Sequence, residues 1–368
     1  MFPMQKLTFR STAFAVLLAA VLVFSSACSG ERRGDSTTPG AAGETVRLQG
    51  AGATFPNPLY QKWLSEYGKV NAKAKIDYQS KGSGFGIQQI QSQTVDFGAS
   101  DAPMSDDDLK KAQGEILHIP TVLGAVVITY NLASVTQPLR FSPDVLADIY
   151  LGKIKKWNDA RIAADNPGVN LPANDITVVH RSDGSGTTAI FTEYLSKVSP
   201  DWKTKPGAGK SIDWPVGIGG QGNEAVAGQV KNTPNTIGYV ELAYAVQTKL
   251  PVALLKNKAG NFVEPSLDAV TAAAAETVAD TPPDLRVSIT DAAGANAYPI
   301  SAYTYILVYK DQKDATKGKV LVEFLWWGLH DGERFAKDLQ YSPLPPQIVE
   351  KASAMVNSIT SGGKPLRS

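Results

Sequence analysis

The sequence predicts an α/β protein of two lobes, each built on a mixed, mostly parallel sheet flanked by helices. Its 368 residues exceed one typical domain and fit two units of about 150 residues each. Apolar side chains make up 43% of the chain, enough for a sizeable core. From Thr45 onward, short apolar runs typical of strands alternate with amphipathic patterns typical of helices. That alternation favours strands joined by crossover helices.

The first part of the chain repeats a strand–turn–helix plan. We expect strands over 46–50, 75–79 and 95–101 and a long buried strand over 119–130. After the turn GAGATF a helix begins at Asn57, and after the turn KGSGFG an apolar helix face begins with Ile87 and Ile90. Ser105 and Asp108 have the spacing of a capping box for a short helix.

The same alternation resumes after Asn131. Ser142 and Pro143 open a helix, a strand follows over 176–180, and RSDGSGTT leads into another helix. Asn223 is expected to cap a helix, and TIGYVEL supplies a strand near Ile237. We expect the last elements to be a long strand over 297–311 and helices over 320–339 and 348–356.

The N-terminus has the layout of a secretory signal peptide. Lys6 and Arg10 precede an uncharged, mostly apolar run over 11–24, and small residues lead into Cys28. This arrangement resembles a bacterial lipobox and predicts cleavage of residues 1–27 and lipidation of Cys28, with an uncleaved membrane anchor as the alternative. Residues 28–44 then form a flexible tether. We therefore expect an exported protein, lipid-anchored in the periplasm or at the outer face of the cell membrane.

Composition excludes several classes of function. With 36 basic and 35 acidic side chains, the chain has no broad attraction for nucleic acid. Cys28 is the only cysteine, which excludes an intramolecular disulfide and a cysteine-rich metal site. His118, His180 and His330 fall in no metal-ligand spacing, so we expect no metal and no cofactor.

Three glycine-rich strand-to-helix turns suit a compact oxyanion. They are GAGATF at 50–55, GSGFG at 82–86 and RSDGSGTT at 181–188. In open α/β sheets such turns present helix N-termini, whose free N–H groups and dipoles favour anions. Each turn taken alone is more typical of an ordinary helix cap.

The motifs of nucleotide binding and of serine nucleophiles do not match this sequence. KPGAGKS resembles the end of a nucleotide P-loop, but Thr204 stands where the opening glycine is required, so Lys210 is expected in a surface loop. Neither Ser83 nor Ser185 lies in G-x-S-x-G. The acidic run 106–108 is explained by its place at a helix N-terminus.

Five segments together resemble a known family. GAGATFPNPLYQKW, VDFGASDAPMS, LGKIKKWND, RSDGSGTT and GYVELAYA closely resemble the PstS-type phosphate-binding proteins of bacterial high-affinity ABC phosphate importers. The resemblance runs from about Leu48 to Pro365. It implies the two-lobed periplasmic-binding-protein fold (type II-like) with two hinge crossings, near Tyr130 and Ala297. Lobe I would comprise 45–130 and 298–368, and lobe II 131–297.

The resemblance also implies a phosphate site. Its residues would be Thr54, Phe55 (through its backbone N–H), Ser83, Asp101, Arg181, Ser185, Gly186 and Thr187. Amides of Phe55, Ser83, Ser185, Gly186 and Thr187 would join the hydroxyls and the Arg181 guanidinium as donors. Asp183 would hold that guanidinium in place, with a helix N-cap as its alternative role.

Asp101 is the exception among these donors. A carboxylate repels an anion unless the anion carries a proton to donate. Phosphate has such a proton at neutral pH and sulfate does not, so Asp101 is expected to exclude sulfate.

The implied function is binding without catalysis. A monomer would enclose inorganic phosphate between its lobes and deliver it to an ABC permease that works with cytoplasmic ATPase subunits. The alternatives are another oxyanion or a small organic phosphate as cargo, or a secreted phosphatase with Ser185 or Ser83 as its nucleophile.

Overall fold

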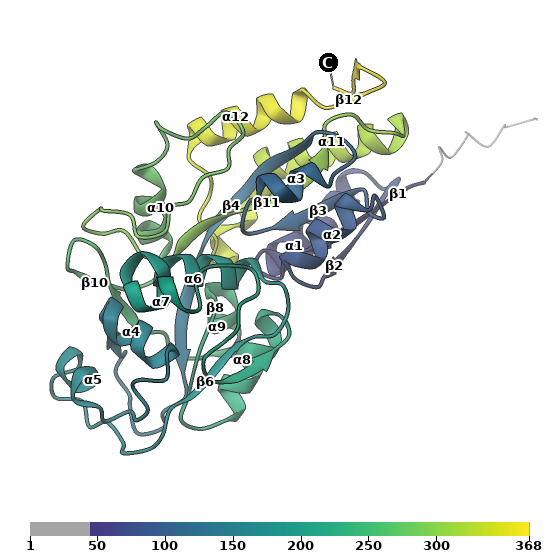
Figure 1. Ribbon diagram of the computed structural model, residues 1–368. Coiled ribbons are helices and arrows are strands. Elements are labelled where there is room, and N and C mark those ends of the chain that lie inside the picture. Colours follow the sequence, from purple (N-terminus) through teal and green to yellow (C-terminus); the bar gives the residue numbers. More distant parts are fainter. Residues whose placement is uncertain (1–44, 368) are drawn as a thin grey trace, which may run out of the picture. The chain divides into compact units, whose positions relative to one another are not determined.

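An eight-stranded mixed sheet runs through the structure, a computed structural model that describes residues 45–367 (Figure 1). The strand order is β2-β1-β3-β11-β4-β8-β6-β7. Its strands are β1 (Val46–Gly52), β2 (Ala74–Ser80), β3 (Phe97–Ser100), β4 (Ile116–Tyr130), β6 (Thr177–Arg181), β7 (Ile218–Gly220), β8 (Thr236–Glu241) and β11 (Ser301–Tyr309). The expected signal peptide, the Cys28 lipidation and the tether over 28–44 lie outside the described residues.

The sheet is parallel at both ends and antiparallel in the middle. β1 pairs in parallel with β2 and β3, and β6 with β8 and β7, whereas β11, β4 and their neighbours pair antiparallel. Every residue of β4 is buried, which explains its continuous apolar sequence. The mixed α/β class expected from the sequence is confirmed.

β4 joins two halves of this sheet. Along β4 the partner changes between Ala125, which pairs with Ser301 of β11, and Val126, which pairs with Glu241 of β8. We call β2, β1, β3 and β11 the first half and β8, β6 and β7 the second half; Figure 1 shows them at opposite ends of β4. The chain thus passes from one half to the other inside a strand, five residues before the expected crossing near Tyr130. The proposed lobe boundaries stay a prediction.

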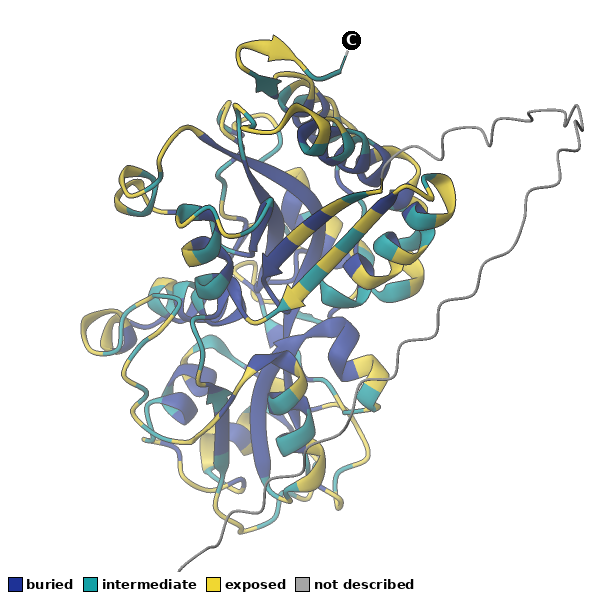
Figure 2. Cartoon of the chain, turned by 90° about the vertical axis from the view of Figure 1, so that its right-hand side faces the viewer, coloured by how far each residue is buried: buried dark blue, intermediate teal, exposed yellow. Residues whose placement is uncertain are grey.

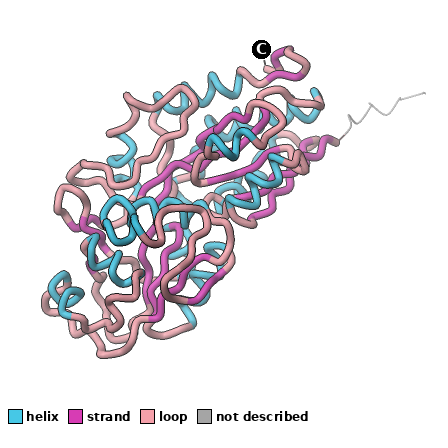
Figure 3. Tube along the Cα trace, in the orientation of Figure 1, coloured by secondary structure: helices cyan, strands magenta, loops and turns pink. Residues whose placement is uncertain are grey.

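Helices flank the strands on both sides (Figure 3). They are α1 (Asn57–Val70), α2 (Ser83–Gln91), α3 (Asp106–Lys110), α4 (Pro143–Tyr150), α5 (Ala160–Asp165), α6 (Gly186–Val198), α7 (Pro200–Thr204), α8 (Gly222–Asn232), α9 (Leu242–Thr248), α10 (Leu267–Ala275), α11 (Ala315–His330) and α12 (Pro346–Asn357). Short 3₁₀ helices follow α11 at Gly332–Phe335 and Lys337–Leu339. No helix within 45–367 is long and apolar enough to cross a membrane.

Small sheets complete the fold. One combines β5 (Arg140–Phe141), β9 (Leu254–Lys256) and β10 (Phe262–Val263), and the other is a hairpin of β12 (Thr360–Ser361) and β13 (Lys364–Pro365). The sequence pattern gave no sign of these strands, because two or three residues are too few to show a period.

Several expected element ends can be compared with the structure. The capping box of Ser105 and Asp108 is confirmed at α3. The expected cap role of Asn223 is wrong, because Gln221 precedes α8 and Asn223 is its second residue. α2 begins at Ser83, so the predicted turn GSGFG is mostly the first turn of the helix.

The core consists mainly of large aromatic and aliphatic side chains, and Figure 2 shows the buried residues concentrated in the central strands. In the first half, Trp63 of α1 meets Phe324 and Trp327 of α11 in edge-on contacts. In the second half, Tyr239 of β8 stacks on Phe191 of α6 with ring centroids 4.4 Å apart. Burial of each aromatic side chain stabilises the fold by roughly 2–3 kcal/mol. This packing holds the strands and their ends in place against the helices.

Candidate functional site

The three glycine-rich turns lie together where the two halves of the sheet meet. The β1–α1 turn carries Thr54 and Phe55, and Ser83 begins α2. The segment 181–187 runs from the end of β6 into the first turn of α6. The N–H of Gly84 in α2 donates to the Gly184 carbonyl across the two halves at 2.7 Å. The sequence-predicted residues are thereby brought into one buried cluster, and Thr54, Phe55, Ser83, Asp101, Arg181, Ser185 and Thr187 are each at most 3% exposed.

Gly186 makes the closest approach in this cluster. A Cβ at this position would lie 2.4 Å from Ser83 Oγ and 2.5 Å from Asp101 Oδ2. Both distances are far below contact distance, so only glycine allows α6 to approach the first half this closely.

Backbone donors are left free at this junction. Within residues 45–367, the N–H groups of Phe55, Ser83, Gly186 and Thr187 have no protein acceptor. The last three lie in the first turns of α2 and α6, where helix geometry supplies no acceptor. Four N–H groups with no acceptor and two helix N-termini make this a site for an anion.

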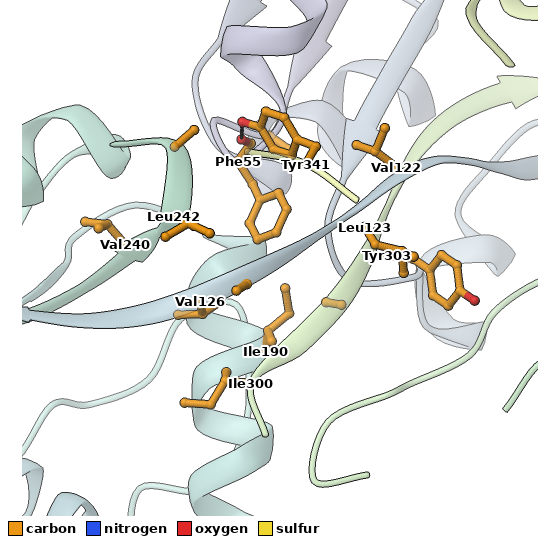
Figure 4. Close-up of a cluster of buried hydrophobic side chains, with 14 of the residues drawn as sticks. Phe55, Val122, Leu123, Val126, Ile190, Val240, Leu242, Ile300, Tyr303 and Tyr341 are labelled. Atoms are coloured by element: carbon orange, nitrogen blue, oxygen red, sulfur yellow. Dashed lines mark hydrogen bonds between the residues drawn. The ribbon is translucent and has the colours of Figure 1, made fainter. Parts of the chain in front are cut away.

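The turn that carries Phe55 is held in place by the core. The Phe55 side chain points toward β4 and the apolar core, where Val126 and Leu242 lie nearby (Figure 4). Its carbonyl accepts a hydrogen bond of 2.6 Å from the hydroxyl of Tyr341, drawn as a dashed line in Figure 4. The apolar ring and the tied carbonyl together hold the Phe55 N–H in place at the site.

Asp101 is the buried carboxylate of the cluster. Its Oδ1 accepts from the Thr304 hydroxyl at 2.8 Å, and its Oδ2 accepts from the Ser83 hydroxyl at 3.2 Å. Burial raises the pKa of Asp101 to about 7, against the opposing effects of the Thr304 hydrogen bond and the positive charge of Arg181. Asp101 can therefore gain or lose a proton near neutral pH.

Arg181 is fixed by Asp183. Its Nε and Nη2 donate to the two carboxylate oxygens at 2.8 and 2.5 Å, the paired geometry that orients a guanidinium most firmly. Burial alone would raise the pKa of Asp183, but the hydrogen bonds and charge of Arg181 hold it below its ordinary value. This is the geometry that the expected holding role requires, whereas α6 is capped by Ser185.

Ser185 differs from the expectation in one respect. Its N–H donates to the Lys210 carbonyl at 2.8 Å, so this amide is already occupied, contrary to the predicted set of amide donors. Its Oγ accepts from the Thr188 N–H at 3.0 Å as the helix cap. Only the hydroxyl proton of Ser185 is left for a ligand.

Asn223 and Thr304 belong to this cluster but were not predicted from the sequence. Asn223 is fully buried and contacts both Thr54 and Thr187. It directly follows the glycine-rich segment GIGGQG, which contains β7 and the turn into α8, so a fourth strand-to-helix turn was the sign that could have found it. Thr304 lies inside buried β11, and nothing in its sequence context distinguishes it from a core residue.

Two cavities lie beside the cluster. One of about 450 Å³ is lined by Asp101, Arg286 and Tyr303 among others. The other, of about 410 Å³, is lined by Arg181, Lys210 and Trp214 among others. Within the described residues, no group of three or more His, Cys, Asp and Glu side chains is placed to hold a metal ion.

The chain is similar to known proteins in both sequence and fold. A family model described as the PBP superfamily domain matches residues 39–326. The chain is 46% identical over 324 residues to the phosphate-binding protein PstS of Xylella fastidiosa (strain 9a5c), covering 87% of this chain and 88% of the relative. It is 47% identical over 308 residues to PstS of Pasteurella multocida (strain Pm70), covering 83% and 89%.

The fold also matches solved structures. The phosphate-binding protein from Stenotrophomonas maltophilia superposes with a TM-score of 0.65 at 21% identity, covering 84% of this chain and 93% of that one. At this identity the match shows the fold alone.

Proposed function

The chain belongs to the family of the PstS phosphate-binding proteins, and from this membership we propose that it binds inorganic phosphate between the two halves of its sheet and delivers it to an ABC permease. The observation that carries the proposal is the convergence of free N–H groups, hydroxyls and one guanidinium around the buried carboxyl group of Asp101. That combination suits an anion that accepts many hydrogen bonds and donates one.

The donors come from both halves. Phe55 and Ser83 supply N–H groups from the first half, and Gly186 and Thr187 supply them from α6 in the second. Arg181 adds the full positive charge, and the hydroxyls of Thr54 and Ser185 add neutral donors. Because only the closed arrangement offers all these groups at once, phosphate stabilises it.

Asp101 gives the proposed site its selectivity. An ionised Asp101 accepts the O–H of bound phosphate, whereas sulfate at neutral pH has no proton to give and leaves two negative charges facing each other. A buried polar mismatch of this kind can separate two ligands by a factor on the order of 10⁴.

Release to a permease completes the proposed function. We place the chain outside the cytoplasm, held by a lipid on Cys28 and the tether that follows it, with the lobe division at 45–130 plus 298–368 and 131–297. It acts as a monomer, and the permease with its ATPase subunits opens the two lobes.

The proposed function has no chemical step. The Ser185 Oγ caps α6, and the Ser83 hydroxyl donates to Asp101 at 3.2 Å. Release of phosphate from a phosphomonoester such as p-nitrophenyl phosphate, retained through purification and lost in Ser83→Ala, would show catalysis instead.

Calorimetric titration tests the proposal directly. The purified chain, stripped of phosphate, is titrated at neutral pH with phosphate and then with sulfate. We expect one-to-one binding of phosphate at micromolar concentration or tighter and no heat from sulfate. For Asp101→Ala we expect sulfate to bind. Absence of phosphate heat from a folded, ligand-free sample would overturn the proposal, and unchanged rejection of sulfate by the variant would overturn the role of Asp101.

A further inference from the structure

Asn223 lies at the centre of the contacts between the two halves. Its backbone N–H donates to Thr54 Oγ1 at 3.2 Å, and its side-chain Nδ2 donates to the same oxygen at 2.9 Å. The same Nδ2 donates to Thr187 Oγ1 at 3.2 Å. One fully buried side chain thus contacts two hydroxyls of the proposed site, from opposite halves of the sheet.

The orientation of the Asn223 carboxamide is unambiguous. Its Oδ1 accepts from the backbone N–H of Glu241 at 3.0 Å, and a backbone N–H can only donate. The oxygen therefore faces β8, and the NH₂ group must face the two threonines.

These contacts leave each threonine hydroxyl able only to donate its proton. A hydroxyl oxygen has two lone pairs and one proton. Both lone pairs of Thr54 are occupied by Asn223, and those of Thr187 are occupied by Asn223 and by Arg181 Nη1 at 3.3 Å. Within the described residues neither hydroxyl proton has a protein acceptor, so both protons remain for a ligand.

We infer that Asn223 is a positioning residue that fixes the hydroxyls of Thr54 and Thr187 as hydrogen-bond donors toward the ligand. This rests on the proposed function, and it leaves Asp101 as the acceptor that the described residues of the cluster present to the ligand. Without Asn223, either hydroxyl could rotate and present a lone pair to an anion, which is repulsive. Preorganised donors avoid that cost at the moment of binding.

Asn223→Asp tests this directly, because the substitution keeps the size and reverses the hydrogen-bonding character. An ionised carboxylate accepts from Thr54 and Thr187 and turns both protons away from the ligand. At pH 8 we expect inorganic phosphate to bind to this variant roughly 100-fold or more weakly than to the parent, from the loss of two charge-assisted hydrogen bonds.

The pH profile separates positioning from a merely structural role. As the introduced carboxyl takes up a proton, it can donate again, so the ratio of variant to parent affinity should recover at lower pH. The ratio cancels the titration of phosphate itself. The ionisable and charged groups around Asn223, common to both proteins, are Arg181, Asp183, Glu224, Glu241 and Tyr244, with Asp101 across the cluster.

Two further variants keep the test decisive. Asn223→Ala removes the amide without adding charge, and we expect roughly tenfold weaker binding with a ratio that does not change with pH. Asn166→Asp is the matched control. Asn166, which follows α5, is also buried, but its carboxamide forms hydrogen bonds only with the backbone of Arg140 and Ile162. Its phosphate affinity should stay within about threefold of the parent.

The outcomes distinguish this inference from the proposed function. If the parent binds phosphate but Asn223→Asp binds within threefold of it at pH 8, or loses affinity by a factor that does not change with pH, the positioning role is wrong. If Asn223→Asp does not fold, an unchanged affinity in Asn223→Ala overturns the inference. If the parent itself binds no phosphate, the proposed function fails first.

Discussion

At the scale of single residues, the site depends on one carboxyl group surrounded by donors. Asp101 is buried and receives hydrogen bonds from Ser83 and Thr304, yet its pKa is raised to about 7 because burial outweighs these contacts. A group poised in this way can meet a protonated oxyanion as an acceptor. The raised pKa of Asp101 also makes the stability of the ligand-free protein depend on pH.

We expect Asp101 to destabilise the ligand-free fold as pH rises. The carboxyl loses its proton near its ordinary pKa of 3.8 in the unfolded chain and near 7 in the folded one. Between those values the folded chain holds the extra proton, so the free energy of unfolding falls as pH rises from about 4 to 7. Asp101→Asn should remove this component, which thermal unfolding without phosphate between pH 4 and 8 would measure.

A second buried acid serves as the comparison in that experiment. Burial also holds the pKa of Glu241 well above its ordinary value, so Glu241 contributes with the same sign. Glu241→Gln therefore separates the two contributions. Parallel curves of melting temperature against pH for the parent and Asp101→Asn would show that the Asp101 carboxyl is not the group that titrates.

At the scale of elements, strand-to-helix turns decide where the donors lie. α2 and α6 begin directly at the candidate site, so their unbonded N–H groups are available there without any side chain being needed. The cost is a steric demand on the first residue of α6. Gly186 meets Ser83 and Asp101 at distances that leave no room for a methyl group.

Gly186→Ala should therefore weaken phosphate binding. The added Cβ prevents α6 from reaching the first half, and overpacking of this kind corresponds to roughly 10- to 100-fold in affinity. Gly228→Ala on α8 is the control, because nothing lies within 4 Å of a Cβ placed there. Calorimetry should find the control within about twofold of the parent, and equal affinities for both variants would contradict the steric argument.

At the scale of the whole described chain, a few polar contacts connect the two halves outside the site. Lys210, in the loop before β7, forms an ion pair of 3.1 Å with Asp108 of α3. The sequence predicted only a surface loop around Lys210. The structure adds that its carbonyl anchors Ser185 and its ammonium group reaches the other half.

Loss of this ion pair should speed phosphate release. A partly exposed pair is worth roughly 0.5–1 kcal/mol, so we expect Lys210→Met to raise the release rate about twofold to fivefold. Lys153→Met is the control, because Lys153 pairs with Asp148 of α4 and Asp201 of α7, all within the stretch between β4 and β7. Stopped-flow measurement of phosphate release gives both rates, and high salt should narrow the difference. An unchanged rate in Lys210→Met would mean that this pair does not hold the closed form.

Much of the fold and most of the candidate cluster could be predicted from local sequence. The strands near 46, 75 and 177 and the helices from Asn57 and after 186 follow from apolar periodicity and glycine-rich turns. The capping box at Ser105 and Asp108 is likewise a local pattern of two residues. Short strands and exact helix starts could not be predicted in this way, because packing rather than local preference decides them.

The sequence by itself determined the α/β class, the family and most of the residues that gather in the cluster, because each depends on residue type and local spacing. Only the tertiary structure decided how those residues are used. It placed Asn223 between Thr54 and Thr187, brought Thr304 to Asp101 and occupied the Ser185 amide with the Lys210 carbonyl. These are contacts between segments distant in the chain, and hydrogen-bond partners of that kind are set by how the halves of the sheet pack, which no local pattern records.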